Sequence, residues 1–459
     1  MDRRRVVITG MGLVSPLPSS LEHFQEALVS RKGAVRPFLW NGKTVPSVSV
    51  AAPALFEGTI EDFDLRDTGQ KKVIKKALKV MSREIQMAVA SSCRALLHAN
   101  IQFGQFPSQR IGISFGSDYI LTTVEDVIDG IRACCYDPKN LKDSKNSNGS
   151  KDSNGLNGLN GLKNSETETG FDFSRWASKG LTKMQPLWQL KYLPNMPSSH
   201  IAIINNFHGP SNSITLREAS VGACVGESVE IIASGRADMM VVGTTGSRLH
   251  PLKMLHAIQQ EELTSTECKP FDRNRDGTVL GEGAGAVVLE ELEHAQKRNA
   301  TIWGEVVCGS YRTRYDRIKT DRKREVIKSV LCDVLRRSGM DPEQIGHINA
   351  HGLGSRELDY AETLAIHDVF GNRKKSIPLN AAKGFFGNLG AGGGTVELIV
   401  GVLALQRGLL FPTLNFSTPD PECPVMPNQN ADTPSGQSFI KIAVNPQAQA
   451  SAVLVRQFR

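Results

Sequence analysis

Short runs rich in β-branched residues alternate along the chain with longer amphipathic stretches, and glycines bound many of the runs. The short runs predict strands and the longer stretches predict helices. Strands that alternate with helices in this way indicate an α/β protein with a largely parallel sheet. We expect strands over residues 5–10, 110–116, 213–216, 237–243, 285–292, 346–350 and 376–381, and helices over 70–99, 218–234, 322–338, 357–370 and 394–407.

Two glycines stand where helices should end. Gly235 and Gly371 each follow one of the expected helices. A glycine at this place commonly takes the left-handed conformation and closes the last helical turn. We therefore expect both residues to be left-handed helix caps.

The composition changes sharply between residues 137 and 170. This segment reads "DPKNLKDSKNSNGSKDSNGLNGLNGLKNSETETG", with a threefold Asn-Gly-Leu unit and almost no large apolar side chain. Such a segment cannot bury enough apolar surface to offset the entropy lost on ordering. We expect a disordered surface insertion.

Length and cysteine usage indicate an ordinary globular protein. The chain has 459 residues, 40% of them hydrophobic, which is enough for a large buried core. Its eight cysteines form no Cys-x-x-Cys pair, so we expect reduced thiols. The start "MDRRRVVITGMGLVSP" lacks the apolar core and cleavage site of a signal peptide, and no window reaches the roughly 20 apolar residues of a membrane helix. A cytoplasmic protein without a membrane span is expected.

The formal net charge of +7 favours an acidic partner or substrate. Nucleic acid is the first alternative to consider. The basic runs at residues 69–79 and 312–328 lack the interleaved aromatic residues that stack on bases, and they are typical of solvated helix faces. We therefore expect no nucleic-acid partner.

Three glycine-rich pieces raise the question of a nucleotide site. "GMGLVS" (10–15) lacks the third glycine of the dinucleotide fingerprint, "LGEGAG" (280–285) precedes an expected strand, and "GNLGAGGG" (387–394) lacks the Lys-Ser/Thr pair of a phosphate loop. Close backbone packing explains all three. The ten histidines show no ligand spacing, so we expect neither a metal nor another cofactor.

Two ionisable residues follow neighbouring strands. His351 ends the run "GHINAHG", and Lys383 follows the next expected strand in "NAAKGFFGN". Open α/β folds collect ligand-binding groups at the carboxyl ends of their strands. Each residue alone is as consistent with a structural role as with a catalytic one, but together they indicate a site.

Five stretches resemble the β-ketoacyl-acyl-carrier-protein synthases of the thiolase superfamily: "VVITGMGLVSPL", "FHGPSNSIT", "PFDRNRDGTVLGEGAGAVVLEELEHAQKRNA", "NAHGLGSRELDYAE" and "KGFFGNLGAGGGTVE". The resemblance runs from about residue 5 to 455. It implies a thiolase-like α/β fold of five layers, αβαβα, made of two topologically similar halves, 1–265 and 266–459, and usually a dimer.

The family's reaction uses a cysteine thiolate at a helix N-terminus, two histidines that stabilise an enolate, and a supporting lysine and glutamate. The resemblance places the first histidine at His351, the lysine at Lys383 and the glutamate at Glu362. Three positions depart from the pattern. The nucleophilic cysteine is replaced by Glu218, the second histidine by Asn388, and the closing "GFGG" loop by "NPQA" (445–448).

A glutamate at the nucleophile's position cannot store an acyl chain as a stable thioester. Glu218 should instead gain from the positive end of the helix dipole, and we expect it to pair with Lys383 or His351. Cys224 is not a displaced nucleophile on this reading. It lies six residues further along the helix, about 240° around it, and is expected to be a buried thiol beside Val221 and Val225.

The resemblance leaves three functions open. The first is a non-condensing subunit, similar to a chain-length factor, that pairs with an active ketosynthase, shapes its acyl tunnel and binds acyl carrier protein. The second is a divergent condensing or malonyl-decarboxylating acyltransferase that uses His351, Lys383 and Asn388. The third is an acyl-binding homodimer. We favour the first, because decarboxylating relatives keep both histidines and this sequence has replaced one.

Overall fold

The computed structural model describes residues 3–40, 42–45, 47–65, 68–102, 104–136, 170–315 and 321–458. Most of the expected insertion, residues 137–169, lies outside the described residues. The chain forms two compact units, one made of residues 1–121 and 192–459 and the other of residues 122–191. In the described residues no helix is long and apolar enough to cross a membrane.

The larger unit is built on a sheet to which the described residues contribute twelve strands. Ten of them lie side by side in the order β12-β11-β13-β14-β10-β1-β9-β8-β4-β7, and β2 and β3 attach beside β9. The strands are β1 (Val6–Val14), β2 (Arg36–Pro37), β3 (Val50–Ala52), β4 (Ile111–Ser117), β7 (Ser211–Ile214), β8 (Met239–Ser247), β9 (Leu280–Glu291), β10 (Gly304–Thr313), β11 (His347–Asn349), β12 (Leu379–Asn380), β13 (Ser438–Val444) and β14 (Gln449–Arg456).

The ten strands fall into two sets of five with the same topology. Numbered within each set, both run 1-5-4-2-3: β1, β9, β8, β4, β7 and then β10, β14, β13, β11, β12. In each set the first three strands are antiparallel and the last two pairings are parallel. β1 and β10 join the sets through two antiparallel residue pairs. The expected pair of similar halves is confirmed, whereas the division after residue 265 stays a prediction.

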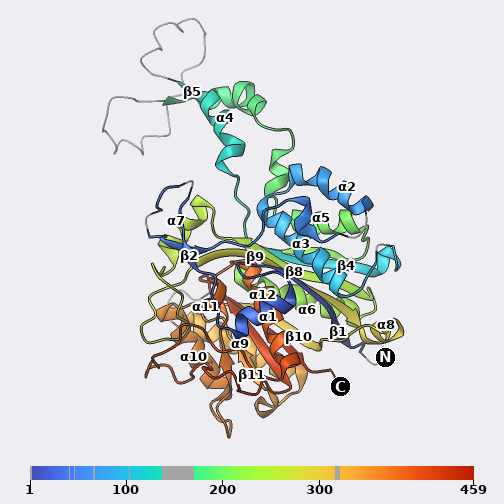
Figure 1. The fold of residues 1–459 in the computed structure, drawn as a ribbon, viewed down its shortest axis with the longest axis vertical. Coiled ribbons are helices and arrows are strands. Elements are labelled where there is room, and N and C mark those ends of the chain that lie inside the picture. Colours follow the sequence, from blue (N-terminus) through green and yellow to red (C-terminus); the bar gives the residue numbers. More distant parts are fainter. Residues whose placement is uncertain are drawn as a thin grey trace, which may run out of the picture. The chain divides into compact units, whose positions relative to one another are not determined.

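Helices cover the two strand sets in layers. α3 (Arg83–His98) and α5 (Met196–Asn205) pack on the first set, and α9 (Arg322–Ser338) packs on the second, with α10 (Arg356–Phe370) beside α9 and sharing its core cluster. α6 (Ser220–Ala233) and α12 (Ala391–Arg407) contact strands of both sets. Figure 1 shows α3 and α5 on one side of β8 and β9, with α6 and α12 on the other side. This is the five-layered arrangement that the resemblance implied.

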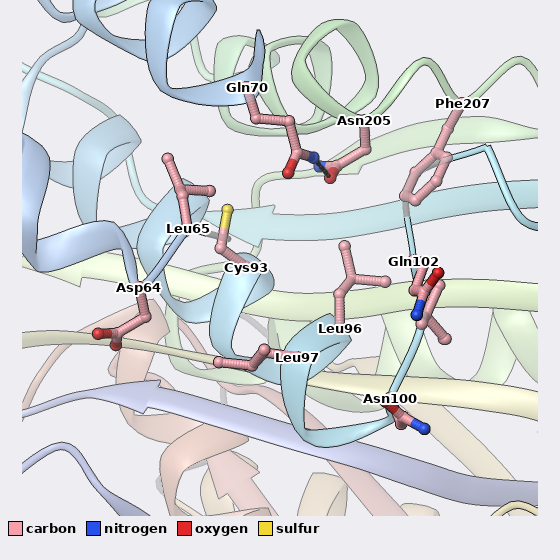
Figure 2. Close-up of a pocket in the computed structure, with 11 residues that line it drawn as sticks. Asp64, Leu65, Gln70, Cys93, Leu96, Leu97, Asn100, Gln102, Asn205 and Phe207 are labelled. Carbon is pink, nitrogen blue, oxygen red and sulfur yellow. Dashed lines mark hydrogen bonds between the residues drawn. The ribbon is translucent and has the colours of Figure 1, made fainter. Parts of the chain in front are cut away.

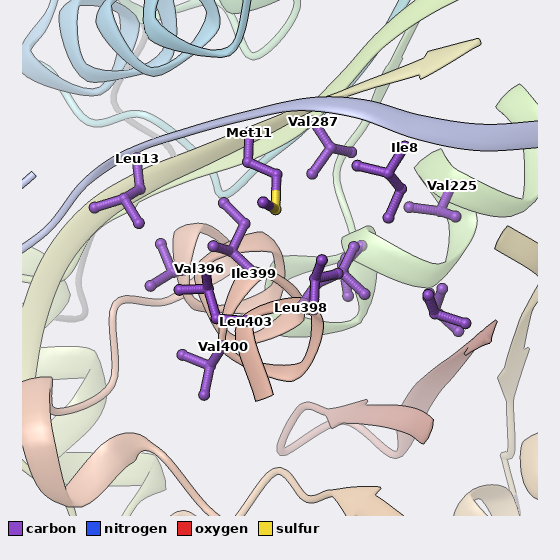
Figure 3. Packing of buried hydrophobic residues seen from close by; sticks show 14 of the residues in the cluster. Ile8, Met11, Leu13, Val225, Val287, Val396, Leu398, Ile399, Val400 and Leu403 are labelled. Atoms are coloured by element: carbon purple, nitrogen blue, oxygen red, sulfur yellow. The ribbon is translucent and has the colours of Figure 1, made fainter. Parts of the chain in front are cut away.

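The central layer is the core of the unit. α12 is buried from Ala391 to Leu405, as expected of a helix that is apolar on all sides. Its side chains pack under β1 and β9 and beside α6, where Figure 3 shows Val396 and Ile399 near Met11. Short helices complete this unit: α1 (Leu21–Val29), α2 (Thr68–Ala77), α7 (Pro251–Gln260), α8 (Leu292–Lys297) and α11 (Lys383–Phe386).

The glycine-rich pieces serve close packing, as predicted. A Cβ atom on Gly12 would lie 2.3 Å from the carbonyl oxygen of Ser91, and one on Gly392 would lie 2.0 Å from that of Gly283. Both contacts are far shorter than van der Waals separation, so β1 can approach α3, and α12 can approach β9, only without side chains there.

Several expectations about the elements are wrong. The sheet is mixed instead of largely parallel, because β1 and β10 pair antiparallel with strands distant in sequence and β13 and β14 form an antiparallel hairpin. The strand expected at 285–292 begins at Leu280, and the helix expected at 70–99 is broken between α2 and α3. Gly235 has the expected left-handed φ of 76°, but Gly371 has a right-handed φ of −65°. β10, β13 and β14 were not predicted.

The smaller unit contains α4 (Val124–Cys134), the two-stranded pair β5 (Cys135–Tyr136) and β6 (Gly170–Phe171), and several single helical turns. An ion pair joins Lys191 Nζ to Asp126 Oδ2 at 2.9 Å within this unit. All eight cysteines of the chain are free, in agreement with the expected reduced thiols.

Candidate active site

The predicted site residues follow the ends of strands. Glu218 lies in a single turn, η9 (Arg217–Ala219), between β7 and α6, which is the strand-to-helix corner expected from the sequence. Lys383 is the first residue of α11, just after β12, and His351 follows β11 by two residues. Glu218 and Lys383 thus occupy matching places in the two strand sets, since each follows the third strand of its set.

Glu218 is buried, with 2% of its surface exposed, and has partners different from those we expected. Its Oε1 lies 3.1 Å from Arg248 Nη1 and 3.3 Å from Asn388 Nδ2, and its Oε2 lies 3.4 Å from Arg217 Nε. The predicted pairing with Lys383 or His351 is therefore wrong. Arg248 follows β8 directly and its long side chain reaches the corner from the same half of the chain.

Glu261 completes the group of charges at the corner. Its Oε1 lies 2.6 Å from Arg248 Nη2 and 3.0 Å from Arg217 Nη2. We call Arg217, Glu218, Arg248 and Glu261 the arginine–glutamate cluster. Burial alone would raise the pKa of Glu218, but the two arginines bring that pKa below its usual value. Glu218 is consequently a carboxylate anion at neutral pH.

A second buried cluster surrounds Lys383. Its Nζ donates to Glu397 Oε1 at 2.6 Å, to the carbonyl oxygen of His351 at 2.8 Å and to His351 Nδ1 at 3.2 Å. Lys441 Nζ lies 2.5 Å from the other oxygen of Glu397. We call Lys383, Glu397 and Lys441 the lysine–glutamate cluster. The ammonium of Lys383 has all three of its hydrogens engaged, so it holds the His351 ring in place.

His351 is a neutral imidazole. Burial lowers its pKa well below the usual value, and Lys383, Lys441 and Arg248 lower it further. Because an ammonium can only donate, Nδ1 of His351 accepts from Lys383 and the ring proton resides on Nε2. The predicted convergence of His351 and Lys383 is thus present in the structure.

Glu362 supports the backbone beside His351. Its two oxygens accept hydrogen bonds from the amides of His351, at 2.7 Å, and Gly352, at 2.9 Å. Burial raises the pKa of Glu362 from 4.5 to about 7, against the effect of these two amides.

This raised pKa predicts a pH-dependent stability. Between pH 4.5 and about 7 the folded chain keeps a proton on Glu362 that the unfolded chain has released. The stability contributed by this proton is present below pH 4.5 and is lost as the pH rises through about 7, and it amounts to about 3 kcal/mol. We expect Glu362→Gln to reduce the slope of unfolding free energy against pH, measured by urea denaturation. Glu357→Gln on the exposed side of α10 is the control, and equal slopes in both variants would contradict the assignment.

The two remaining departures from the family pattern are also ordered. Asn388 Oδ1 accepts from the amide of Gly390 at 3.0 Å, while its Nδ2 donates to Glu218. In the "NPQA" loop, Asn445 Oδ1 accepts from the amides of Gln447 and Gln449, and Asn445 Nδ2 donates to the carbonyl oxygen of Leu216 at 3.2 Å. The loop is therefore tied to the strand-to-helix corner.

Sequence reasoning missed five charged residues of the site: Arg217, Arg248, Glu261, Glu397 and Lys441. Two of them left a signal. Glu397 interrupts the apolar stretch of α12, and Lys441 interrupts the apolar strand "FIKIAV". A lone charge in such a run must be paired, because an unpaired buried charge is too costly. Arg217, Arg248 and Glu261 do not interrupt an apolar run and gave no such signal.

Cys224 is a core residue, as predicted. It is fully buried in α6, and burial raises the pKa of its thiol to about 12. The thiol is therefore protonated at neutral pH and is a poor nucleophile.

A separate cavity of about 370 Å³ lies beside α3. Figure 2 shows Gln70 and Asn205 joined by a hydrogen bond of 2.9 Å at this cavity, with the sulfur of Cys93 nearby. Burial raises the pKa of the Cys93 thiol to about 12, so the cavity does not offer a reactive thiolate. None of the predicted site residues lines it.

Two models of known protein families match most of the chain. The model described as "Beta-ketoacyl synthase, N-terminal domain" matches residues 3–151 and 161–295, and the one described as "Beta-ketoacyl synthase, C-terminal domain" matches residues 306–417. The chain belongs to the β-ketoacyl synthase family. The resemblance drawn from the sequence is confirmed, and the ketosynthase family works in fatty-acid and polyketide synthesis.

Curated ketosynthases match over nearly the full chain. The 3-oxoacyl-[acyl-carrier-protein] synthase 2 of Coxiella burnetii is 28% identical over 453 residues, covering 96% of each chain. The protein of the same name from Synechocystis is 27% identical and covers 92% of this chain and 90% of its own.

Solved structures agree on the fold. A β-ketoacyl synthase from Burkholderia phymatum superposes with a TM-score of 0.78 at 23% identity, covering 99% of this chain and all of the other. The ishigamide ketosynthase/chain length factor superposes with a TM-score of 0.79 at 21% identity over the full length of both chains.

Proposed function

We propose that this protein is a non-condensing ketosynthase-like subunit that pairs with an active β-ketoacyl-acyl-carrier-protein synthase and shapes its acyl tunnel. One observation carries the proposal. The corner that should present a thiol holds the buried carboxylate of Glu218, fixed by Arg248, Arg217 and Asn388.

The chemistry of this corner supports a non-condensing role. A carboxylate could accept an acyl group only as an anhydride, which water cleaves readily. A negative charge also opposes the enolate that forms when a malonyl group loses carbon dioxide. Asn388, at the place of the second histidine, is engaged with Glu218 and Gly390. Storage of the acyl chain and stabilisation of the enolate are therefore both impaired.

An exposed sheet edge supports pairing with a second ketosynthase-like chain. β7 is the last strand in the sheet order, and Ser211 and Asn212 on it are exposed. A groove of about 600 Å³ runs along β7 and reaches β10, with Ile214, Tyr311 and Arg337 among its lining residues. Unpaired backbone groups on an edge strand favour addition of a strand from another chain. A solved structure of similar fold is described as a ketosynthase/chain length factor.

Co-purification tests the proposal. We expect this chain, co-expressed with a ketosynthase that keeps Cys-His-His, to form a stable complex whose products differ in length from those of the ketosynthase alone. Turnover of malonyl-carrier by the isolated chain would favour the enzyme alternative instead. An isolated homodimer that retains acyl chains and binds no ketosynthase would favour the acyl-binding alternative.

Restoring the thiol alone should not restore condensation. We expect Glu218→Cys to give no product above background with acyl- and malonyl-carrier substrates, because Asn388 and the "NPQA" loop remain and Arg217 and Arg248 lose a partner. Product formation is measured by mass spectrometry of the carrier-bound acyl group. A single variant that condensed would overturn the non-condensing assignment.

A lysine-rich helix supports binding of an acidic carrier protein. Lys71, Lys72, Lys75 and Lys76 of α2 are exposed, and no carboxylate in the described part of the chain lies within ion-pair distance of them. A surface of unpaired positive charge attracts an acidic protein and speeds its association.

Charge reversal on α2 should weaken this binding. We expect Lys71→Glu with Lys75→Glu, which lie one helical turn apart, to weaken binding of an acyl carrier protein about tenfold at low salt. Lys374→Glu with Lys375→Glu, also exposed, is the control and should change binding much less. Surface plasmon resonance measures both, and an equal effect of the two pairs would argue against α2 as the docking surface.

A further inference from the structure

Three nitrogen donors from three separate segments converge on the carboxylate of Glu218. Arg248 Nη1 and Asn388 Nδ2 lie within 3.1 and 3.3 Å of Oε1, and Arg217 Nε lies 3.4 Å from Oε2. Arg248 and Asn388 are almost completely buried. Paired arginines with an added amide are a typical arrangement for recognising a carboxylate.

Each donor is also held by a partner other than Glu218. Arg248 Nη2 is fixed by Glu261 at 2.6 Å, and Asn388 is fixed through its Oδ1 by the amide of Gly390. Arg217 Nη2 is fixed by Glu261 at 3.0 Å, and its Nη1 reaches Gln447 at 3.3 Å. Removal of the Glu218 side chain therefore leaves the three donors in place. The donors form a preorganised site.

The charge of the cluster favours one monovalent anion. Two arginines face two glutamates, so the arginine–glutamate cluster is neutral while Glu218 is present. Without Glu218 the rest of the cluster carries one net positive charge, beside the buried Asp118, whose pKa is raised by burial. In addition, Arg217 Nε and Glu218 Oε2 are buried and make no hydrogen bond among the described residues. The Glu218 side chain is tethered to the backbone and leaves Arg217 Nε without a hydrogen bond. A free carboxylate could rotate to accept that hydrogen bond.

We propose that Arg217, Arg248 and Asn388 form a binding site for a small aliphatic monocarboxylate, and that Glu218 occupies this site as an internal ligand. This inference rests on the proposed function and deepens it. The carboxylate of Glu218 keeps an external acid out of the place where an acyl group would react in a condensing enzyme. The ligand class follows from the atoms. Glu218→Ala removes two carbons and two oxygens, which are the heavy atoms of acetate.

The experiment is rescue of Glu218→Ala by acetate. We expect sodium acetate to raise the thermal midpoint of this variant saturably, by about 2 °C at ten times the dissociation constant, relative to sodium chloride at equal ionic strength. Wild-type protein and Glu218→Gln should show no such difference, because their side chains still fill the site. The double variant Glu218→Ala with Arg248→Met should also show none, because it lacks the principal donor.

Other results of the acetate experiment would contradict the proposal. An acetate response equal to that of chloride, or an equal response of wild-type protein, would overturn the proposal. If Glu218→Ala does not fold in chloride, the measurement becomes the yield of folded protein on refolding in acetate, and failure to recover it there would count against the site. Both readouts use the isolated chain without condensation or a partner, so their failure is distinguishable from failure of the subunit assignment.

Discussion

Replacing Glu397 with alanine is expected to lower the free energy of unfolding by about 3 to 5 kcal/mol. Glu397 lies between the ammonium groups of Lys383 and Lys441, at 2.6 and 2.5 Å, and all three side chains are almost completely buried. The variant leaves two positive charges without a counterion in the interior. Urea denaturation followed by circular dichroism measures the change in midpoint at constant slope.

The control is an exposed ion pair of the same chemistry. Glu293 lies 3.9 Å from Lys297, and both side chains are more than three-quarters exposed. Glu293→Ala should change stability by less than about 0.5 kcal/mol, because water screens such a pair. If Glu397→Ala cost as little as Glu293→Ala, the lysine–glutamate cluster could not be a buried network of charges.

Replacing Arg248 with methionine should have a comparable effect. Methionine keeps much of the side-chain volume but leaves Glu218 without its 3.1 Å partner and weakens the support of Glu261. We expect a loss of about 3 to 5 kcal/mol in the free energy of unfolding. Adding Glu218→Gln to this variant should recover about 1 to 3 kcal/mol, because the amide removes the uncompensated charge.

A double-mutant cycle measures this coupling. The four proteins are the wild type, Arg248→Met, Glu218→Gln and the double variant, each unfolded in urea. If the loss of unfolding free energy in the double variant equalled the sum of the losses in the two single variants, Glu218 and Arg248 would not interact. That result would remove the basis of the arginine–glutamate cluster. Glu293→Ala, at the exposed 3.9 Å pair with Lys297, is a control that should remain additive with Glu218→Gln.

The sequence predicted the contacts of His351 and Lys383 better than those of Glu218. His351 and Lys383 were predicted to converge because the ends of neighbouring strands share one edge of a sheet, and their atoms lie 3.2 Å apart. Glu218 was placed correctly at its corner but with the wrong partners. Which cation reaches a buried carboxylate depends on side-chain length and on the twist of β8, and neither is readable from residue spacing.

The missing strands have a related explanation. β10 pairs antiparallel with β1 and β14, both far away in sequence, and β13 pairs with the distant β11 as well as forming a hairpin with β14. The local patterns of these strands therefore carry only part of the information that fixes them. β13 also contains Lys441, whose charge interrupts an otherwise apolar run and weakens its signal. The charge of this lysine is balanced by Glu397 of α12, a different element of the fold.

The arginine–glutamate cluster also constrains how such a site can evolve. A change of Glu218 to cysteine would leave Glu261 alone to balance two guanidinium groups, and a change of Arg248 first would leave Arg217 alone to balance two carboxylates. Either single change leaves one buried charge without a counterion and is expected to lower the free energy of unfolding. Exchange of Glu218 for a thiol is therefore expected to be tolerated best when the two arginines are exchanged with it.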